Sequence, residues 1–281
     1  MKLQDKLLEN KQDKKAILAC NFYNYETLKG VCLAVKAQKV PIILQLTRSS
    51  IEYMGLHMAV AMGRTALDHF GLEGWIHLDH GDSPELAYKC LEAGFDSVMI
   101  DASEKSFEEN IMITRQVVKY ARNYGASVEA ELGYVPKLGQ LQDKSGFTEP
   151  EEAKRFVQET GVNALAVAIG SSHGFYKEEP KLDLERLAEI NRVADACLVL
   201  HGGSGIPGHV LKEAVKRGIC KINIATEIKN IFMKTLIGLL KETEEIDLRK
   251  VFPPAINAVS LLVQEKLAIV SSNSPGEPVG G

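Results

Sequence analysis

The sequence predicts a single (β/α)8 TIM barrel, and three observations lead to this prediction. Short apolar runs alternate with longer segments of helical periodicity, which is typical of repeated β/α units. Eight such runs fit within 281 residues, and barrels of this kind form one domain of about 250 residues. Polar residues gather where the runs end, and in such barrels the catalytic groups come from the carboxyl ends of the strands.

The expected strands are short apolar runs that stop at a polar or glycine-bearing turn. They are 17–22, 41–46, 75–79, 97–101, 127–132, 164–169, 197–200 and 221–225. The segments between them are expected to be helices, and 149–152 supplies the proline and acidic residues of a helix start before 153–160. The barrel should span about 16–240, with its eighth helix at 227–240. A helical appendage at 247–270 and a flexible tail at 271–281 complete the expected single domain, 1–281.

Composition and charge indicate an ordinary globular protein. Hydrophobic residues at 45% and charged residues at 25% match that class. A net charge of -4 gives no support to a nucleic-acid or membrane partner. No apolar run reaches the length of a membrane span, and the charged segment 1–15 is unlike a signal peptide, so a cytoplasmic location is expected. The five cysteines lack metal-ligand spacing and are expected to be buried thiols.

Three histidines stand at the carboxyl ends of expected strands, each directly before a glycine. They are His80, His173 and His201. A lone histidine there is usually a hydrogen-bonded loop residue, but three imidazoles with an open fourth position are typical of a catalytic zinc site. Asp79 beside them could act as general acid or base. Strand alternation places His77 on the face opposite His80, so a structural or supporting role is expected for it.

Two turns after strands seven and eight are candidates for phosphate binding. The first is Gly202-Gly203-Ser204-Gly205, and the second lies around Asn223-Ile224-Ala225-Thr226. Backbone N–H groups in glycine-rich turns form a concave site for oxyanions, and TIM barrels often bind phosphate after these two strands. Close backbone packing is the alternative explanation of the glycines. A doubly wound open sheet would instead need a glycine loop after its first strand, and none is present.

Several motifs together resemble the class II, metal-dependent ketose-bisphosphate aldolases. They are HLDHG, GFDSVMIDAS with FEENI, SVEAELG, TGVNALAVAIGSSHG, LVLHGGSGIP and KINIATE, in order from about Ala19 to Glu227. The resemblance implies one Zn²⁺ per subunit on His80, His173 and His201, with Asp79 as the catalytic acid/base. It also implies a homodimer or homotetramer, and a cytoplasmic enzyme of sugar-phosphate metabolism.

The resemblance further implies roles for residues around the metal. The loops for phosphate and a monovalent cation, Na⁺ or K⁺, match Gly174, Gly202, Ser204, Ala225 and Thr226. Asn223 matches the residue that holds the triose phosphate, and Asn21 and Gln45 match residues that line the pocket of this phosphate. Arg249 matches an arginine that reaches the C6 phosphate from the neighbouring subunit. Asp101 and Glu131 are expected to support the ligands or to form an alternative metal site.

The expected reaction cleaves a ketose 1-phosphate or 1,6-bisphosphate into dihydroxyacetone phosphate and an aldehyde. The metal would polarise the C2 carbonyl, and Asp79 would take the proton of the C4 hydroxyl so that the C3–C4 bond breaks. Polarisation can remove several kcal/mol from the barrier, and a positioned carboxylate adds a factor of ~10² to 10⁴. A Schiff-base aldolase would instead need a lysine inside the barrel. Lys221 is expected at the amino end of strand eight, on the wrong side.

Three departures from the family pattern bear on the substrate. Residues 134–140 replace the usual glycine and acidic pairs, so Asp143 or water must move the proton at C3. Ala225 is similar to the tagatose-bisphosphate branch of the family. Arg48 follows Thr47 in the expected loop after strand two, where its fork of donors would suit a phosphate or sulfonate. A surface arginine paired with neighbouring acids is an equal alternative.

Alternatives therefore remain for the substrate and for the class of protein. The substrate is a tagatose- or fructose-type bisphosphate, or a C6-modified ketose such as 6-deoxy-6-sulfofructose 1-phosphate, which would give sulfolactaldehyde. A non-catalytic barrel that binds a metal and a phosphosugar is conceivable, although it would not need Asp79 beside an open metal site. A zinc amidohydrolase would require an H-x-H pair on strand one, which is absent.

Overall fold

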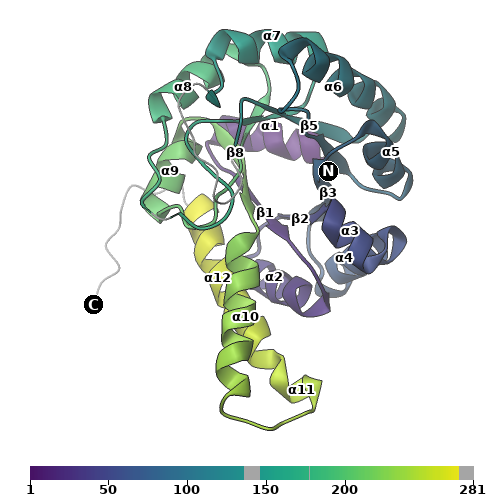
Figure 1. The fold of residues 1–281 in the computed structure, drawn as a ribbon, viewed down its shortest axis with the longest axis vertical. Coiled ribbons are helices and arrows are strands. Elements are labelled where there is room, and N and C mark those ends of the chain that lie inside the picture. The colour runs from purple at the N-terminus through teal and green to yellow at the C-terminus, as the bar shows by residue number, and fades with distance from the viewer. Residues whose placement is uncertain (136–145, 177, 272–281) are drawn as a thin grey trace.

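The protein is a closed barrel of eight parallel strands surrounded by helices (Figure 1). A computed structural model describes residues 1–135, 146–176 and 178–271. Each strand pairs with the next along the chain, and β8 returns to pair with β1. The predicted (β/α)8 barrel is confirmed.

All eight predicted apolar runs contain a strand. The strands are β1 Ile17–Asn21, β2 Ile42–Thr47, β3 Gly74–Gly81, β4 Ser97–Ile100, β5 Ser127–Leu132, β6 Ala164–Val167, β7 Cys197–Leu200 and β8 Ile219–Ile224. Two strands differ from the prediction in ways that affect the site. β3 continues through His80 and Gly81, and β8 begins at Ile219, so Lys221 lies within the strand.

Helices follow the strands and form the outer layer. They are α1 Leu3–Asp13, α2 Tyr25–Gln38, α3 Arg48–Met54, α4 Leu56–Phe70, α5 Pro84–Glu92, α6 Phe107–Ala121, the short 3-10 helix Arg122–Tyr124, α7 Pro150–Thr160, α8 Leu184–Val193, α9 Gly208–Lys216, α10 Thr226–Leu240, α11 Leu248–Val251 and α12 Pro253–Ser271. Local sequence explains several starts. A capping box of Asn24 and Thr27 begins α2, and Pro150 begins α7 as predicted.

The predicted appendage at 247–270 consists of α11 and α12, which together with α10 project from the barrel (Figure 1). We call α10–α12 the arm. The first turns of α12 pack against α2, where a Cβ on Gly30 would lie 2.9 Å from the carbonyl oxygen of Ile256. Glycine there lets the two helices approach closely. Asp143 and nearly all of the predicted tail, 272–281, lie outside the described residues.

The inside of the barrel has an apolar layer and a polar layer. At the amino ends of the strands, the inward residues form one buried apolar cluster: Ile17, Ala19, Ile43, Trp75, Ala164, Ala166, Cys197, Val199 and Cys220. Leu3 and Leu7 of α1, a helix that was not predicted, pack against this cluster. Further along the same strands, the buried residues are polar: Asn21, Gln45, His77, Asp79, Glu129, Glu131, Lys221 and Asn223. Buried polar groups are costly without partners, so this layer must be internally bonded. Within the described ranges, no helix is long and apolar enough to cross a membrane.

Candidate active site

The three predicted ligands meet at the carboxyl ends of the strands. His80 ends β3, His173 follows β6 and His201 directly follows β7. The imidazole nitrogens that could bind an ion lie within 4.8 Å of one another. His80 Nε2 and His201 Nδ1 are 3.0 Å apart. We call these three residues the histidine cluster.

His80 reaches the cluster because the backbone of β3 is irregular there. Its φ is 51°, a left-handed conformation that is uncommon for a residue other than glycine. The pairing of β3 with β4 shifts register between Leu78 and Gly81, and such a bulge re-aims the side chains around it. His77, Asp79 and His80 therefore all point into the barrel. The prediction that His77 faces away from His80 is wrong, because it assumed regular alternation.

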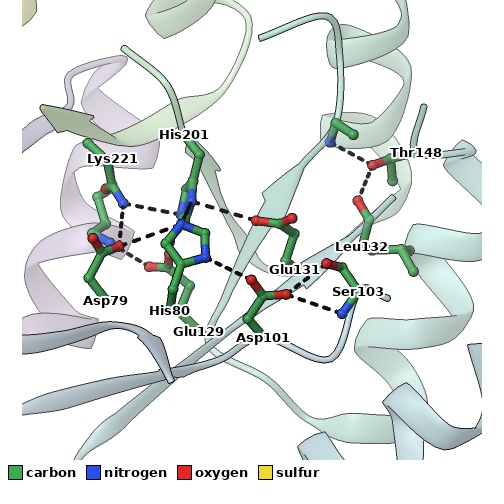
Figure 2. A network of polar contacts seen from close by, with 12 residues as sticks. Asp79, His80, Asp101, Ser103, Glu129, Glu131, Leu132, Thr148, His201 and Lys221 are labelled. Atoms are coloured by element: carbon green, nitrogen blue, oxygen red, sulfur yellow. Dashed lines mark hydrogen bonds and ion pairs between the residues drawn. The ribbon is translucent and has the colours of Figure 1, made fainter. Parts of the chain in front are cut away.

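Carboxylates fix the orientation of two of the imidazoles (Figure 2). His80 Nδ1 lies 2.8 Å from Asp101 Oδ2, and His201 Nε2 lies 2.9 Å from Glu129 Oε1. Each carboxylate accepts a hydrogen bond from the ring nitrogen that faces it, so that when a metal is bound the other ring nitrogen can offer its lone pair to the ion. Together with His173, these two imidazoles form a set of three that fits a divalent ion such as Zn²⁺.

The electrostatics of the cluster favour a cation. Burial opposes protonation of His80, but the carboxylates of Asp79 and Asp101 raise its pKa to about 9. Burial, with the nearby charge of Asp101, raises the pKa of Glu131 to about 8. Among the residues that the structure describes, the buried Glu131 Oε2 has no hydrogen-bond partner, and Glu131 forms a second possible ligand group with His80 and Asp101. Asp101 and Glu131, which were expected to support the ligands, therefore lie beside the cluster.

Asp79 is held by amide donors from two other strands. Asn21 Nδ2 donates to Asp79 Oδ2 at 2.9 Å, and Asn223 Nδ2 donates to Oδ1 at 3.2 Å. Gln45 donates in turn to Asn21 Oδ1 at 2.7 Å. Burial opposes ionisation of Asp79, but the charges of His80, His201 and Lys221, together with the hydrogen bond from Asn21, keep its pKa below the usual value. The result is an oriented carboxylate that can accept a proton beside the cluster.

A small cavity of 30 Å³ joins the cluster to the predicted phosphate loops. Its lining is Asn21, Asp79, His80, His173, Gly174, Gly202, Ser204, Asn223, Ala225 and Thr226. Gly174 and Gly202 have φ of 97° and 66°, conformations that favour glycine. Ser204 Oγ accepts from the backbone N–H of Ala225 at 3.4 Å, which ties this loop to the start of α10. The amino end of a helix favours an anion.

Gly203 lies outside that lining, and packing explains why it is a glycine. A Cβ there would lie 2.7 Å from Ile222 Cγ2 and 2.9 Å from the carbonyl oxygen of Asn223. Its N–H donates to the same carbonyl at 3.1 Å. Gly203 therefore lets the β7 loop pack against β8, and a contact of Gly203 with phosphate stays a prediction.

A larger cavity of 450 Å³ opens on the side of β3 and β4. It is lined by His80, Asp82, Asp101, Ala102, Glu104, Lys105 and His173. Two histidines of the cluster line both cavities, so a ligand over the cluster has room on either side. Asp82, Glu104 and Lys105 were missed at the sequence level, although their positions just after strand ends could have indicated them.

Arg48 lies in a helix and not in the predicted loop. It begins α3, which Thr47 caps by accepting a hydrogen bond from the Ser50 N–H. Arg48 Nε lies 2.8 Å from Glu52 Oε1, and Nη1 lies 2.5 Å from Asp82 Oδ2. Because Asp82 lines the larger cavity, Arg48 stands at its rim, with two of its nitrogens already engaged.

Arg249 is placed far along the arm. It lies in α11 at the tip (Figure 1), with its side chain 90% exposed and hydrogen-bonded to Asp247 at 2.9 Å. It is not among the residues that line either cavity of its own chain. Its predicted role requires that a neighbouring subunit supply it.

Lys221 is buried inside the barrel, so the prediction that it lies on the wrong side is incorrect. Its side chain is 1% exposed, and its Nζ lies 2.8 Å from Glu129 Oε2 and 3.2 Å from His77 Nε2. Burial and the adjacent Lys221 charge lower the pKa of His77 to about 3. Lys221 shares the inward face of β8 with Asn223, and that alternation could have revealed it.

Comparisons with known proteins agree with this arrangement. The family model described as fructose-bisphosphate aldolase class-II matches residues 1–274. A fructose-bisphosphate aldolase of Helicobacter pylori is 39% identical over 298 residues, covering 95% of this chain and 96% of the relative. The crystal structure of the YdjI aldolase from Escherichia coli K12 is 31% identical and superimposes with a TM-score of 0.85, covering 95% of this chain and 96% of that one.

A more distant structure supports the fold alone. Fructose-bisphosphate aldolase from Campylobacter jejuni is 21% identical, with a TM-score of 0.78 over 95% of this chain and 93% of that one. The family match covers nearly the whole chain, and it includes every strand that contributes to the histidine cluster. The chain belongs to the class II fructose-bisphosphate aldolase family.

Proposed function

We propose that the chain is a zinc-dependent aldolase that reversibly cleaves a ketose 1-phosphate or 1,6-bisphosphate of the tagatose or fructose type into dihydroxyacetone phosphate and an aldehyde. The observation that carries this proposal is the position of Asp79. Its oriented carboxylate lies beside three convergent imidazoles and lines the same cavity as Gly202 and Ser204. A base, a cation site and a candidate phosphate site are the three parts that the reaction needs.

Each part has a role that follows from its chemistry. Zn²⁺ on the histidine cluster would supply Lewis-acid polarisation of the substrate carbonyl, worth several kcal/mol. The glycine loops orient the substrate by its phosphate, and a monovalent cation, Na⁺ or K⁺, would bind in these loops. Asp79 accepts the proton of the C4 hydroxyl while Asn21 and Asn223 hold its two oxygens. The electrons of the C3–C4 bond then pass to the C2 carbonyl, and C3 takes up a proton from Asp143 or water, as expected from the sequence, to give dihydroxyacetone phosphate.

The group at C6, at the distal end of the substrate, distinguishes the possible ketose phosphates. The larger cavity has room for it, and its lining includes Lys105 but also Asp82 and Glu104. Arg48 at the rim uses Nε and Nη1 for ion pairs, which leaves donors of its guanidinium for an oxyanion. We therefore keep a C6-modified substrate such as 6-deoxy-6-sulfofructose 1-phosphate as the alternative to a 1,6-bisphosphate.

A panel of ketose 1-phosphates that differ at C6 tests both proposals. We expect cleavage of at least one member, and we expect Arg48→Ala to lower kcat/KM about tenfold for substrates with a C6 anion, the value of one charge-assisted hydrogen bond. Substrates with a neutral C6 hydroxyl should be little affected. Arg64→Ala, which removes an arginine paired with Asp96 away from both cavities, is the matched control. If kcat/KM fell by the same factor for both substrate types, Arg48 would be a surface residue that does not bind the C6 group.

We also propose a homodimer or homotetramer that assembles through the arm. The exposed large apolar residues of the arm are Met233, Ile237, Leu240, Ile246, Leu248 and Leu261. Met233, Ile237 and Leu240 are four and three residues apart on α10 and therefore share one face of that helix, and exposed apolar residues that cluster in this way mark interaction sites. Such an interface would also bring Arg249 toward a neighbouring subunit.

Sedimentation of the purified protein at micromolar concentration tests this assembly. We expect a dimer or tetramer, and we expect Ile237→Glu to shift it toward smaller species, because a buried charge without a partner is costly. Met112→Glu changes a similarly exposed apolar residue on α6 and serves as the control. A monomeric parent protein at all concentrations would contradict the proposal.

A further inference from the structure

Beneath the histidine cluster, a buried ion pair leads from β8 to one of the ligands. Lys221 Nζ lies 2.8 Å from Glu129 Oε2, and Glu129 Oε1 lies 2.9 Å from His201 Nε2. The side chains of Lys221, Glu129 and His201 are 1%, 2% and 0% exposed. Figure 2 shows Lys221 and Glu129 beside His80 and His201. Glu129 thus uses one oxygen for the lysine and the other for the ligand.

Stability alone does not explain this ion pair. Desolvating two charges offsets most of their attraction, and replacing such a pair by well-packed apolar residues is often neutral or stabilising. The apolar layer just below, which includes Ala19 and Val199, shows that this barrel can be filled without charge. The pair is nevertheless directed at a residue of the cluster, which indicates a use beyond packing.

We propose that Lys221 is a positioning residue for the metal centre: it fixes the Glu129 carboxylate, which in turn fixes the imidazole of His201 with Nδ1 toward the cation. This inference rests on the proposed function only for the use of the metal in catalysis. His77 is the alternative partner of Glu129, since its Nε2 lies 3.8 Å from Glu129 Oε2. Lys221 lies between them and contacts both. Without Lys221, the carboxylate loses the contact that aligns its second oxygen.

Metal affinity is the quantity that this arrangement controls. Removing the partner of a metal-binding histidine typically costs a factor of ~10 to 100 in affinity. We expect Lys221→Met, which removes the charge and keeps most of the side-chain volume, to weaken zinc binding within that range. The measurement is competition between the metal-free protein and a chromogenic zinc chelator, with no substrate present. The absorption spectrum of the Co²⁺ form reports the coordination independently and should change in the same variant.

A matched control comes from another lysine. Lys11 Nζ donates to the carbonyl oxygen of Ala196 at 2.8 Å, just before the amino end of β7. Lys11→Met removes a comparable lysine contact at the opposite end of the strand from His201. We expect its zinc affinity to stay within about twofold of the parent value. A loss as large as that of Lys221→Met would make the effect a general consequence of destabilising the barrel.

A double variant separates positioning from stability. Lys221→Met leaves Glu129 as a buried charge with one partner fewer, which should lower the denaturant midpoint of the metal-free protein. Lys221→Met combined with Glu129→Gln removes both charges and should restore that midpoint. Zinc affinity should nevertheless remain about tenfold below that of the parent, because an amide is a poorer hydrogen-bond acceptor for His201 than a carboxylate. If the single variant does not fold, the double variant is compared with Glu129→Gln alone. Because Lys221 acts through the Glu129 carboxylate, the two proteins should bind zinc equally, and a further loss caused by Lys221→Met would contradict the inference.

Two results would overturn the inference: a folded Lys221→Met protein that binds zinc within threefold of the parent, or a double variant that regains both stability and affinity. The proposed function is tested separately by the parent protein. If the parent cleaves no ketose phosphate while the affinities follow this pattern, the positioning role stands and the proposed function fails. If the parent is active and the affinities do not change, only the positioning role fails.

Discussion

Removing the metal should abolish cleavage of the ketose phosphate, and adding Zn²⁺ or Co²⁺ should restore it. Lewis-acid polarisation is worth several kcal/mol, and each 1.4 kcal/mol is a factor of ten in rate, so we expect a loss of about 10³ or more. Asp79 cannot compensate, because a carboxylate accepts the proton but does not stabilise the charge left on the carbonyl side. The measurement is the initial rate after dialysis against a chelator, with the residual metal content determined on the same sample.

The control for this prediction is the fold of the metal-free protein. Hydrogen bonds within the polar layer hold its side chains, including Asp79 to Asn21 and His201 to Glu129, so the circular dichroism spectrum should not change on chelation. Borohydride should trap no substrate, since Lys221 is buried in an ion pair with Glu129 and is not free to attack a carbonyl. Full activity without metal, or covalent trapping, would refute a metal-dependent mechanism.

The fold could be predicted because a barrel repeats one local pattern eight times. Each apolar run and each helical segment is encoded in neighbouring residues, and the order of the strands follows from the alternation. Strand ends were less certain. The prediction began strand eight at Lys221, whereas the strand begins at Ile219, and this shift moved the lysine from the interior to the amino end of the strand.

The histidine cluster could be predicted because the carboxyl ends of parallel strands meet on one side of the barrel. His80, His173 and His201 needed only their positions after apolar runs to be brought together. The conformation of His80 could not be predicted, since its left-handed φ depends on the register shift between β3 and β4. Because of that local irregularity, His77 and His80 both point into the barrel, although regular alternation would place them on opposite faces of the strand.

Asp101, the partner of His80, was expected to support the ligands. The partners on the side of His201 could not be predicted, because they come from strands far apart in the chain. Glu129 and Lys221 are separated by 92 positions and lie on strands that do not pair with each other. Arg48 was expected in the loop after strand two, but the hydroxyl of Thr47 caps a helix there. Side-chain contacts across a barrel and around a cap depend on the assembled fold, so sequence periodicity alone does not reveal them.

Replacing Asp79 by asparagine should lower kcat by ~10² to 10⁴ while leaving bound metal and substrate affinity nearly unchanged. The amide cannot accept the C4 hydroxyl proton, and losing a general base typically costs this factor. Metal binding should survive because Asp79 Oδ1 lies 4.0 Å from His80 Nε2 and is not one of the three ligands. The measurements are kcat and KM on the preferred ketose phosphate, together with the zinc content of the variant.

The structure also predicts a local effect of this substitution. Asn21 and Asn223 each donate to one oxygen of Asp79, so an asparagine must turn one NH₂ group toward a donor and lose that hydrogen bond. A modest loss of stability, about 1–3 kcal/mol for a group left unsatisfied, should accompany the loss of rate. Asp96→Asn, which changes a carboxylate paired with Arg64 away from both cavities, should lower stability without a comparable loss of kcat. If Asp79→Asn turned over within about tenfold of the parent, Asp79 would only support the cluster, and another group would have to take the proton.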